Sequence, residues 1–166
     1  KTTLANLISG LYFPDKGEIL YVGESGNEFI STSYRAKVGF VTQDIYLFQG
    51  SLRSNLSSGR SCTEEKIWET LERVDAIDFV RSRGGLDVES AEAGRSLSGG
   101  QRRRLGLARV LLSGSDILIF DEVTAGLDEI NKLAVLKVID RLSKTYIVVM
   151  ISHEKLSLSN SASFSV

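Results

Sequence analysis

The stretch Leu97-Ser98-Gly99-Gly100-Gln101 is followed along the chain by the run Ile117-Leu118-Ile119-Phe120-Asp121-Glu122. A serine and two glycines ahead of the helix-prone segment 102–112 predict bare backbone N–H groups at a helix N-terminus, where peptide dipoles favour an anion. Four apolar residues running into two adjacent acids predict a buried strand that brings carboxylates to the edge of a sheet. Such an edge suits a metal ion and a water, so the two stretches indicate phosphate chemistry.

These two stretches resemble the signature motif and the Walker B strand of the ATP-binding cassette (ABC) ATPases. The resemblance implies an α/β fold of the P-loop NTPase (ABC ATPase) type, a three-layer sandwich with a small inserted helical subdomain. The opening residues Lys1-Thr2-Thr3-Leu4 resemble the end of a Walker A loop. We therefore expect a fragment that begins inside this loop, whose glycines lie upstream, and that lacks the C-terminal end of the domain. The resemblance covers nearly the whole chain.

The composition is that of an ordinary globular protein. Its 166 residues match one domain, on a prior of roughly 100–200 residues per domain. With 42% hydrophobic and 25% charged residues and a formal charge of −1, the chain has no overall attraction to nucleic acid or anionic membranes. A single cysteine, Cys62, permits no internal disulfide and fits a reducing, cytosolic setting. No apolar stretch approaches the roughly 20 residues that span a bilayer, so any membrane contact is expected through another segment or subunit.

Three short apolar runs predict strands that are buried on both faces of a parallel sheet. The runs are Val38–Val41, Ile117–Phe120 and Ile147–Ile151. Polar groups follow each run: Gln43, the pair Asp121 and Glu122, and His153. In an open parallel α/β sheet, ligands bind outside the carboxyl ends of the strands. One site would therefore collect these side chains, beside Lys1.

Apolar residues at helical spacing mark the segments between the strands. They predict a first helix that contains Leu4, Leu7, Ile8 and Leu11 and is closed by Gly10 and Pro14. They also predict a helix over 129–144 that packs on the sheet through Ile130, Leu133, Leu136 and Ile139. Another set fits helices between Gln43 and Ser98, with a plausible helix start at Thr63. We therefore predict a RecA-like core from residues 1–43 and 97–166 and a helical subdomain over about 44–96.

The resemblance implies that ATP and Mg²⁺ bind between the start of the chain and the strand ends. The ammonium group of Lys1 would pair with the β- and γ-phosphates, and Thr3 would support the phosphates from the helix N-terminus. Oxygen-bearing side chains would hold the metal: Thr2, Gln43 and Asp121. A solvated strand end would explain the acids less well, because a partly buried carboxylate is costly unless it is paired or binds a metal.

Catalytic roles also follow from the resemblance. Glu122 would act as the general base that orients and polarises the attacking water. His153, the only histidine, lies beyond Glu122 in the order in which the family presents its switch histidine to the γ-phosphate. Gln43, within Val41-Thr42-Gln43-Asp44, resembles the Q-loop, which touches Mg²⁺ and links the nucleotide to the helical subdomain.

A second cassette is the implied partner. In a head-to-tail dimer, the ATP of one cassette would be capped by the signature residues of the other, Ser98, Gly99, Gly100 and Gln101. The segment Ala125-Gly126-Leu127-Asp128 partly matches the D-loop, with Asp128 near the nucleotide. The family commonly has serine where this chain has Ala125, which puts a hydroxyl-dependent contact across the dimer in doubt.

The basic run Arg102-Arg103-Arg104 has two interpretations. A short charge run on a helix is usually its solvated face, and the neutral overall charge argues against nucleic acid. Its place directly after the signature suggests instead that one or more of these arginines lie near the nucleotide or the dimer interface.

The segment Leu47-Phe48-Gln49-Gly50-Ser51-Leu52-Arg53-Ser54-Asn55 resembles the pattern that exporter-type cassettes carry after the Q-loop. Exporters also carry a glutamate- and glycine-rich loop before the signature, which Glu92-Ala93-Gly94-Arg95 matches in part. Taken alone, Tyr46 and Phe48 would be simple core aromatics. Taken together, these segments favour an exporter.

The implied function is an ATPase that powers transmembrane transport through ATP-driven closure of two cassettes. The transmembrane domain would be fused or separate, at the cytoplasmic face of the cell membrane. A soluble ABC ATPase of DNA repair or translation is an alternative, although the short spacing between Gln43 and Ser98 excludes a long coiled-coil insertion. A regulatory cassette that binds nucleotide without hydrolysing it is another alternative. No nucleic acid partner is expected.

Overall fold

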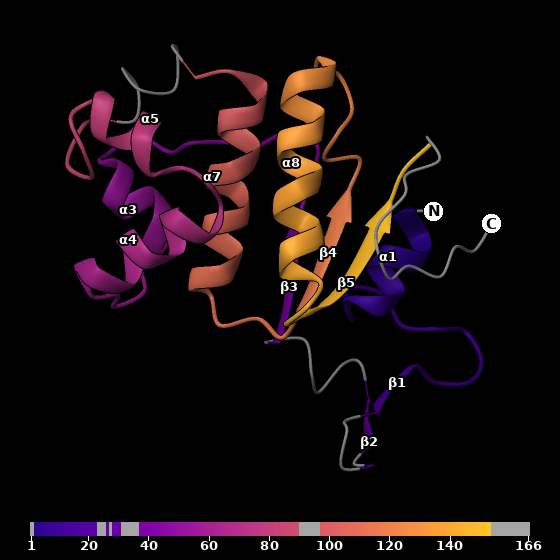
Figure 1. Ribbon diagram of the computed structural model, residues 1–166. Helices are drawn as coiled ribbons and strands as arrows, with labels where there is room; N and C mark the ends of the chain where they lie inside the picture. The colour runs from indigo at the N-terminus through magenta and orange to yellow at the C-terminus, as the bar shows by residue number, and fades with distance from the viewer. Residues whose placement is uncertain (1, 23–25, 27, 31–36, 90–96, 154–166) are drawn as a thin grey trace.

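The computed structural model describes residues 2–22, 26, 28–30, 37–89 and 97–153. Figure 1 shows the order of the elements along the chain. The helices are α1 (Thr2–Ile8), α3 (Leu52–Ser57), α4 (Glu64–Arg73), α5 (Ile77–Ser82), α7 (Gly99–Leu112) and α8 (Glu129–Leu142). The strands are β1 (Leu20–Val22), β2 (Glu28–Ile30), β3 (Val38–Val41), β4 (Ile117–Asp121) and β5 (Ile147–Ile151).

The three predicted strands form one parallel sheet in the order β3-β4-β5. Val41 pairs with Phe120 across β3 and β4, and Asp121 pairs with Ile151 across β4 and β5. The carboxyl ends of all three strands therefore meet at one edge, as the sequence predicts. β4 is the central strand, and its apolar run is buried along its whole length.

Helices cover both faces of this sheet, which makes three layers (Figure 1). Alternate residues of β4 point to opposite faces. Leu118 and Phe120 belong to the cluster that includes buried side chains of α7 and α8. Ile117 and Ile119 pack with Ala5 of α1 on the other face. The predicted α/β sandwich is confirmed.

One glycine sets how closely α7 approaches the sheet. A Cβ at Gly39 in β3 would overlap Val110 of α7 and would lie 2.8 Å from the Ser115 hydroxyl oxygen. A side chain at this position would fit only if Val110 or the helix shifted. The C-terminal part of α7, at Val110, therefore lies directly against the sheet.

Full burial was predicted for all three strands but is found only for β4. Along β3 buried and half-buried residues alternate, and β5 is half-buried with Ile147 exposed. The physical reason is position, because β3 and β5 lie at the two edges of the described three-stranded sheet. An apolar run shows that a strand can be buried, whereas its neighbours decide how far it is.

The apolar face predicted for α8 is wrong in its N-terminal half. Ile130 and Leu133 are 82% and 54% exposed. The helix packs instead through a stripe of buried residues, Val135, Val138, Ile139 and Leu142. Two apolar stripes compete on this helix, and the one that faces β4 lies nearer to the C-terminal end.

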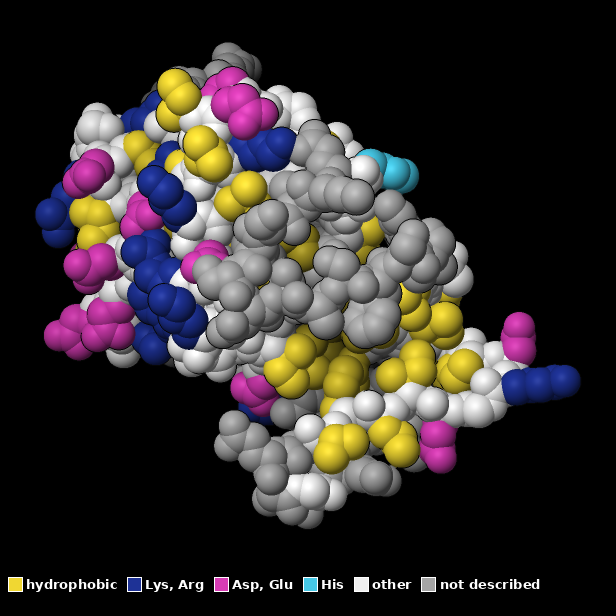
Figure 2. Space-filling model, turned by 45° about the vertical axis from the view of Figure 1, so that its right-hand side comes forward, with side chains coloured by type: hydrophobic (Ala, Val, Ile, Leu, Met, Phe, Trp, Pro, Cys, Tyr) yellow, Lys and Arg dark blue, Asp and Glu magenta, His cyan; other side chains and the backbone are white. Residues whose placement is uncertain are grey.

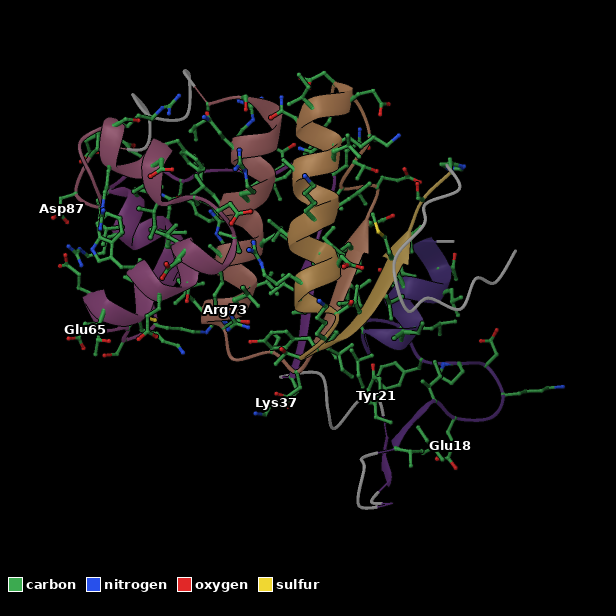
Figure 3. All side chains as sticks on the ribbon, in the orientation of Figure 1. Glu18, Tyr21, Lys37, Glu65, Arg73 and Asp87 are labelled. Carbon is green, nitrogen blue, oxygen red and sulfur yellow. The ribbon has the colours of Figure 1, made fainter. Side chains whose placement is uncertain are left out.

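Helices α3, α4 and α5 gather beside α7, away from the sheet (Figure 1). Thr63 caps α4, as the sequence indicates, by accepting a hydrogen bond from the Lys66 N–H. At the other end of α4, Arg73 donates to the Tyr146 hydroxyl at 3.0 Å and stacks on its ring (Figure 3). This contact joins the helical segment to the start of β5.

Asp75, in the turn between α4 and α5, makes two further connections to the core helices. Its carbonyl oxygen accepts a hydrogen bond from Arg104 of α7 at 2.8 Å. Its carboxylate pairs with Arg141 of α8 at 2.8 Å. The residue has a positive φ of 53°, a conformation that suits aspartate in a tight turn.

Exposed apolar side chains gather around α1 and β1 on the face seen in Figure 2. They include Leu11, Tyr12, Phe13, Leu20 and Val22. Nearby, the Tyr21 hydroxyl donates to the Ile8 carbonyl and ties β1 to the end of α1 (Figure 3). Of the helices that the structure describes, none is long and apolar enough to cross a membrane.

Candidate functional site

The polar residues that were predicted to share one site all lie at the carboxyl edge of the sheet. Gln43 follows the end of β3, Asp121 ends β4, Glu122 comes directly after it, and His153 follows the end of β5. The parallel register brings these ends side by side. Asp121 and Glu122 are half-buried, while Gln43 and His153 are exposed.

Glu122 is the most constrained of these residues. Its φ is +51°, a left-handed conformation that costs a non-glycine residue about 1–3 kcal/mol and tends to occur at functional sites. One carboxylate oxygen, Oε1, is buried and has no hydrogen-bond partner among the described residues. His153 Nε2 lies 3.7 Å from it, too far for a hydrogen bond. A strained backbone and a buried oxygen with unused acceptor capacity both point to a role outside packing.

The signature residues form the start of α7, with Ser98 as its N-cap. The Ser98 hydroxyl accepts a hydrogen bond from the Gln101 N–H, and the Gln101 side chain accepts one from the Ser98 N–H. This is a complete capping box. The prediction of bare N–H groups is therefore wrong for Ser98, whose N–H donates to the Gln101 side chain. The amides that lack an acceptor within the helix are those of Gly99 and Gly100.

The two signature glycines also have a packing role that the sequence does not reveal. A Cβ at Gly99 would lie 2.8 Å from Leu127, and one at Gly100 would lie 2.5 Å from the Asn131 side-chain oxygen. The start of α7 therefore lies directly against the turn after β4 and the first turn of α8. The absence of side chains at Gly99 and Gly100 therefore has two effects: it leaves their amides accessible, and it permits this close contact.

The interpretation of Arg102, Arg103 and Arg104 as a solvated face is wrong. Arg103 is only 7% exposed, and the other two are half-buried. Each donates to a backbone carbonyl oxygen: Arg102 to Leu97, Arg103 to Val123 and Arg104 to Asp75. Burial lowers the pKa of Arg103 and of Arg104. The run anchors α7 to the segments around it.

Asp128 serves as the N-cap of α8. Its carboxylate accepts hydrogen bonds from the Asn131 N–H at 2.9 Å and from the Asn131 side chain at 2.6 Å. These bonds, the backbone bond first, hold the pKa of Asp128 below its ordinary value. The predicted contact of Asp128 with a nucleotide stays a prediction, beside this helix-capping role.

The capping role predicts a specific pH dependence of stability. Because the pKa of Asp128 is lowered by folding, its ionised form stabilises the protein above the unfolded pKa of about 3.9, and this contribution disappears as pH falls through the folded pKa. Asp128→Asn keeps a capping side chain without a charge. We expect its melting temperature to lie below that of the wild type at pH 6 and to converge with it as the pH is lowered to 2.

Thermal unfolding followed by circular dichroism from pH 6 to pH 2 measures this convergence. Asp128→Ala is the comparison variant, because it removes the cap at every pH. A constant difference between wild type and Asp128→Asn over the whole pH range would contradict the assigned role.

The phosphate-binding residues predicted at the chain start are described only in part. Lys1 lies outside the described residues, as does the loop Glu92-Ala93-Gly94-Arg95. Thr2 begins α1, and Thr3 is exposed in its first turn. Ala5 of the same helix packs on β4, which ends at Asp121.

The exporter-like segment is held against α7 by the buried Asn55 and the half-buried Arg109. Asn55 is 2% exposed, and its amide accepts from the Phe48 N–H and donates to the Phe48 carbonyl at 2.6 and 2.8 Å. Arg109 of α7 donates to the Asn55 and Tyr46 carbonyls at 2.9 and 3.0 Å. Burial lowers the pKa of Arg109. These hydrogen bonds therefore attach the segment to the signature helix α7.

Tyr46 and Phe48 themselves are not core residues, contrary to the simpler prediction. They are 73% and 64% exposed, although the Arg109 guanidinium lies 5.5 Å from the Phe48 ring centre. Two aromatic side chains are thus presented to solvent from a segment whose backbone is firmly held.

Sequence reasoning missed Arg103, Arg109, Asn55 and Asn131. A signal existed for Arg103, since Gly100, Arg103, Leu107 and Leu111 recur at helical spacing and all are buried on α7. Asn55 and Asn131 show no such pattern, because Asn55 bonds to backbone groups of Phe48 and Ser51, whereas Asn131 bonds to Asp128 and lies against Gly100 of another helix.

The structure is a three-layer sandwich around a parallel sheet, with two acids where the central strand ends and a capped pair of glycines at the start of α7 nearby. These features define a nucleotide-binding domain of the P-loop class. The family model for ABC transporters matches residues 1–125. The chain belongs to the ABC transporter family, as an ATP-binding domain.

Individual relatives agree with this assignment. An uncharacterized ABC transporter ATP-binding protein of Haemophilus influenzae is 39% identical, with 92% of this chain and 28% of that protein covered. The ATP-dependent lipid A-core flippase of Francisella tularensis is 34% identical, with 96% and 27% covered. The structure of a bacterial Atm1-family ABC exporter with ATP bound gives a TM-score of 0.74 at 31% identity, with 93% and 27% covered. The chain thus spans about a quarter of the length of the curated relatives that it matches.

Proposed function

We propose that this chain hydrolyses ATP as the nucleotide-binding domain of an exporter-type ABC transporter. The observation that carries the proposal is Glu122, a strained residue just after the end of the central strand, whose buried carboxylate oxygen has no hydrogen-bond partner among the described residues. A general base needs acceptor capacity that the fold has left unused. Glu122 has this capacity beside His153, at the edge where parallel sheets bind ligands.

Glu122 would hold the attacking water through its Oε1 and accept its proton. His153, 3.7 Å away and largely exposed, would face the γ-phosphate and help to orient it. The backbone of Glu122 is fixed from both sides, because its N–H donates to the Ile151 carbonyl and its carbonyl accepts from the Ala125 N–H. The base is therefore held against the end of β5, from which the histidine also projects.

The residues at this edge fit Mg²⁺, which prefers oxygen ligands and is usually bound by one or two carboxylates together with substrate phosphates. Asp121 supplies a half-buried carboxylate at the end of β4, and Gln43 supplies an amide oxygen nearby. Thr2 would complete the set with its hydroxyl group. When bound, the ion would neutralise charge that develops on the transferred phosphate. Lys1 and Thr3 would hold the same phosphates from the chain start.

Two cassettes would sandwich the nucleotides in a head-to-tail dimer. The Gly99 and Gly100 amides, with Ser98 and Gln101, would cap the γ-phosphate of ATP bound to the partner cassette, and Asp128 would lie near the same interface. The capping box prepares this site, because it holds the first turn of α7 rigid while it leaves the two glycine amides available. ATP would then favour closure by its higher affinity for the closed dimer.

The segment after Gln43 supports a coupling to transmembrane helices. Tyr46 and Phe48 present exposed aromatic rings, while Asn55 and Arg109 bind their backbone to the signature helix. A transmembrane partner that packs on these rings would move together with α7. We place residues 44–96 in a helical subdomain and 1–43 with 97–166 in the core, at the cytoplasmic face of the cell membrane. A flippase and an exporter among the relatives favour export.

The proposal is tested by ATP turnover of the full-length gene product in proteoliposomes. We expect hydrolysis that requires Mg²⁺ and stops on chelation. Asp121→Asn should reduce turnover at limiting Mg²⁺ and raise the Mg²⁺ concentration needed for half-maximal rate, since an amide binds the ion more weakly than a carboxylate. Asp116→Asn, at an exposed position before β4, is the matched control. Turnover that is independent of Mg²⁺, or equal Mg²⁺ requirements in all three proteins, would contradict the assigned metal site.

A further inference from the structure

Arg103 is a buried cation that reaches from the signature helix to the turn after β4. It is 7% exposed and is the one charged residue among those that are buried in the described part of the chain. Its Nε donates to the Val123 carbonyl at 3.0 Å, and an Nη donates to the Ala125 carbonyl at 3.4 Å. The guanidinium thus binds the carbonyls on both sides of Thr124.

The turn that Arg103 holds is the one that carries the proposed base. Glu122 precedes Val123 and has a φ of +51°, and Gly126 follows Ala125 with a φ of +70°. Inside the turn, the Ala125 N–H donates to the Glu122 carbonyl at 3.0 Å. The positive φ of Glu122, a non-glycine residue, persists only when its surroundings over-determine it. Arg103 adds two side-chain hydrogen bonds to this restraint.

The electrostatics of Arg103 indicate that it positions the turn more than it stabilises the folded protein. Burial penalises the charged guanidinium, and the charge of Asp44, beside Gln43, offsets part of this penalty. Both residues line a cavity of about 460 Å³ between the Q-loop, the start of α7 and Ala125. A buried ion often stabilises a fold no better than an apolar side chain of similar volume. What an apolar side chain cannot supply is the pair of directional bonds to the turn.

We propose that Arg103 is a positioning residue for ATP hydrolysis, which fixes Glu122 and the Ala125–Asp128 segment relative to the signature helix of the same chain. This inference rests on the proposed function. It predicts that the Arg103 side chain links two events: the closure of the dimer over ATP at Gly99 and Gly100, and the alignment of Glu122 with the attacking water. A displacement of about 1 Å at a reacting group can lower a rate by about 10²-fold.

The test is a series of variants of the full-length gene product. Arg103→Met keeps much of the side-chain volume and removes both donors. We expect kcat for ATP to fall by about 10- to 100-fold, with KM changed by less than about threefold, because the lost bonds end on the turn. Arg103→Lys keeps a donor that can reach one carbonyl at a time and should recover part of the rate. Lys137→Met, which removes an exposed cation from α8, is the matched control and should behave as wild type.

A double-mutant cycle separates positioning from a general loss of folding. In a Glu122→Gln background the base is already lost, so Arg103→Met should lower the residual rate by less than about twofold. An equal loss in both backgrounds, or a wild-type kcat in Arg103→Met, would overturn the inference. If Arg103→Met fails to fold, Arg103→Lys in the same cycle decides the question. Failure of the proposed function looks different, because Glu122→Gln would then hydrolyse ATP like wild type.

Discussion

Glu122→Gln is expected to lower ATP turnover of the full-length gene product by about 10²- to 10⁴-fold, or roughly 3–5 kcal/mol in the barrier. Glutamine has almost the same shape as glutamate but cannot accept the proton of the attacking water. ATP binding should persist, and the closed dimer should live longer because hydrolysis would no longer open it. Single-turnover hydrolysis and size-exclusion chromatography with ATP measure the two effects.

The same variant should not be destabilised, which separates chemistry from folding. Oε1 of Glu122 is buried without a hydrogen-bond partner among the described residues, so removal of its charge relieves an unfavourable burial. We expect an equal or higher melting temperature. Glu129→Gln, which changes an exposed glutamate in the first turn of α8, is the matched control and should keep wild-type turnover. Wild-type turnover in Glu122→Gln would rule out Glu122 as the base.

Asn55→Ala is expected to reduce the free energy of unfolding by about 2–4 kcal/mol, equivalent to roughly 5–15 °C in melting temperature. The substitution removes side-chain bonds to both backbone groups of Phe48 and to the Ser51 carbonyl, all within a site that is 2% exposed. It also removes an acceptor for Arg109, whose burial makes a lost partner costly. Chemical denaturation measures the loss.

Ser57→Ala on the same helix is the control for Asn55→Ala. Its hydroxyl makes one long bond of 3.3 Å to the Ser54 carbonyl. We expect a change of less than about 0.5 kcal/mol, as for most surface substitutions. If Asn55→Ala melted no lower than this control, the segment from Tyr46 to Asn55 would have to be held by other contacts.

Much of the fold was predictable because strands and helices leave periodic signals in the sequence. The three apolar runs became β3, β4 and β5, and the acids after Phe120 fixed which edge carries the site. The spacing of Ser98 and Gln101 matches a capping box, so this pairing could also have been found in the sequence. These features depend on residues that are close together along the chain.

The remainder depends on contacts between distant segments. Nothing near Arg103 in the sequence indicates that the carbonyls of Val123 and Ala125 would meet its side chain. Likewise, Ile130 and Leu133 fit an apolar stripe, and only the orientation of α8 on the sheet leaves them exposed. The run of arginines at 102–104 was expected to be exposed and the stripe with Ile130 and Leu133 to be buried, as is usual for such patterns. Tertiary packing reversed both expectations.

Gly39 is a position at which this domain is expected to accept very few substitutions. Every missense change of a glycine codon introduces a side chain, and at this position even the Cβ of alanine would overlap Val110. No conservative neighbour is therefore available in the genetic code, and a compensating change would have to come from the helix opposite. In a library of random single mutants, missense changes at codon 39 should be depleted relative to synonymous ones, because Val110 or the helix would have to shift.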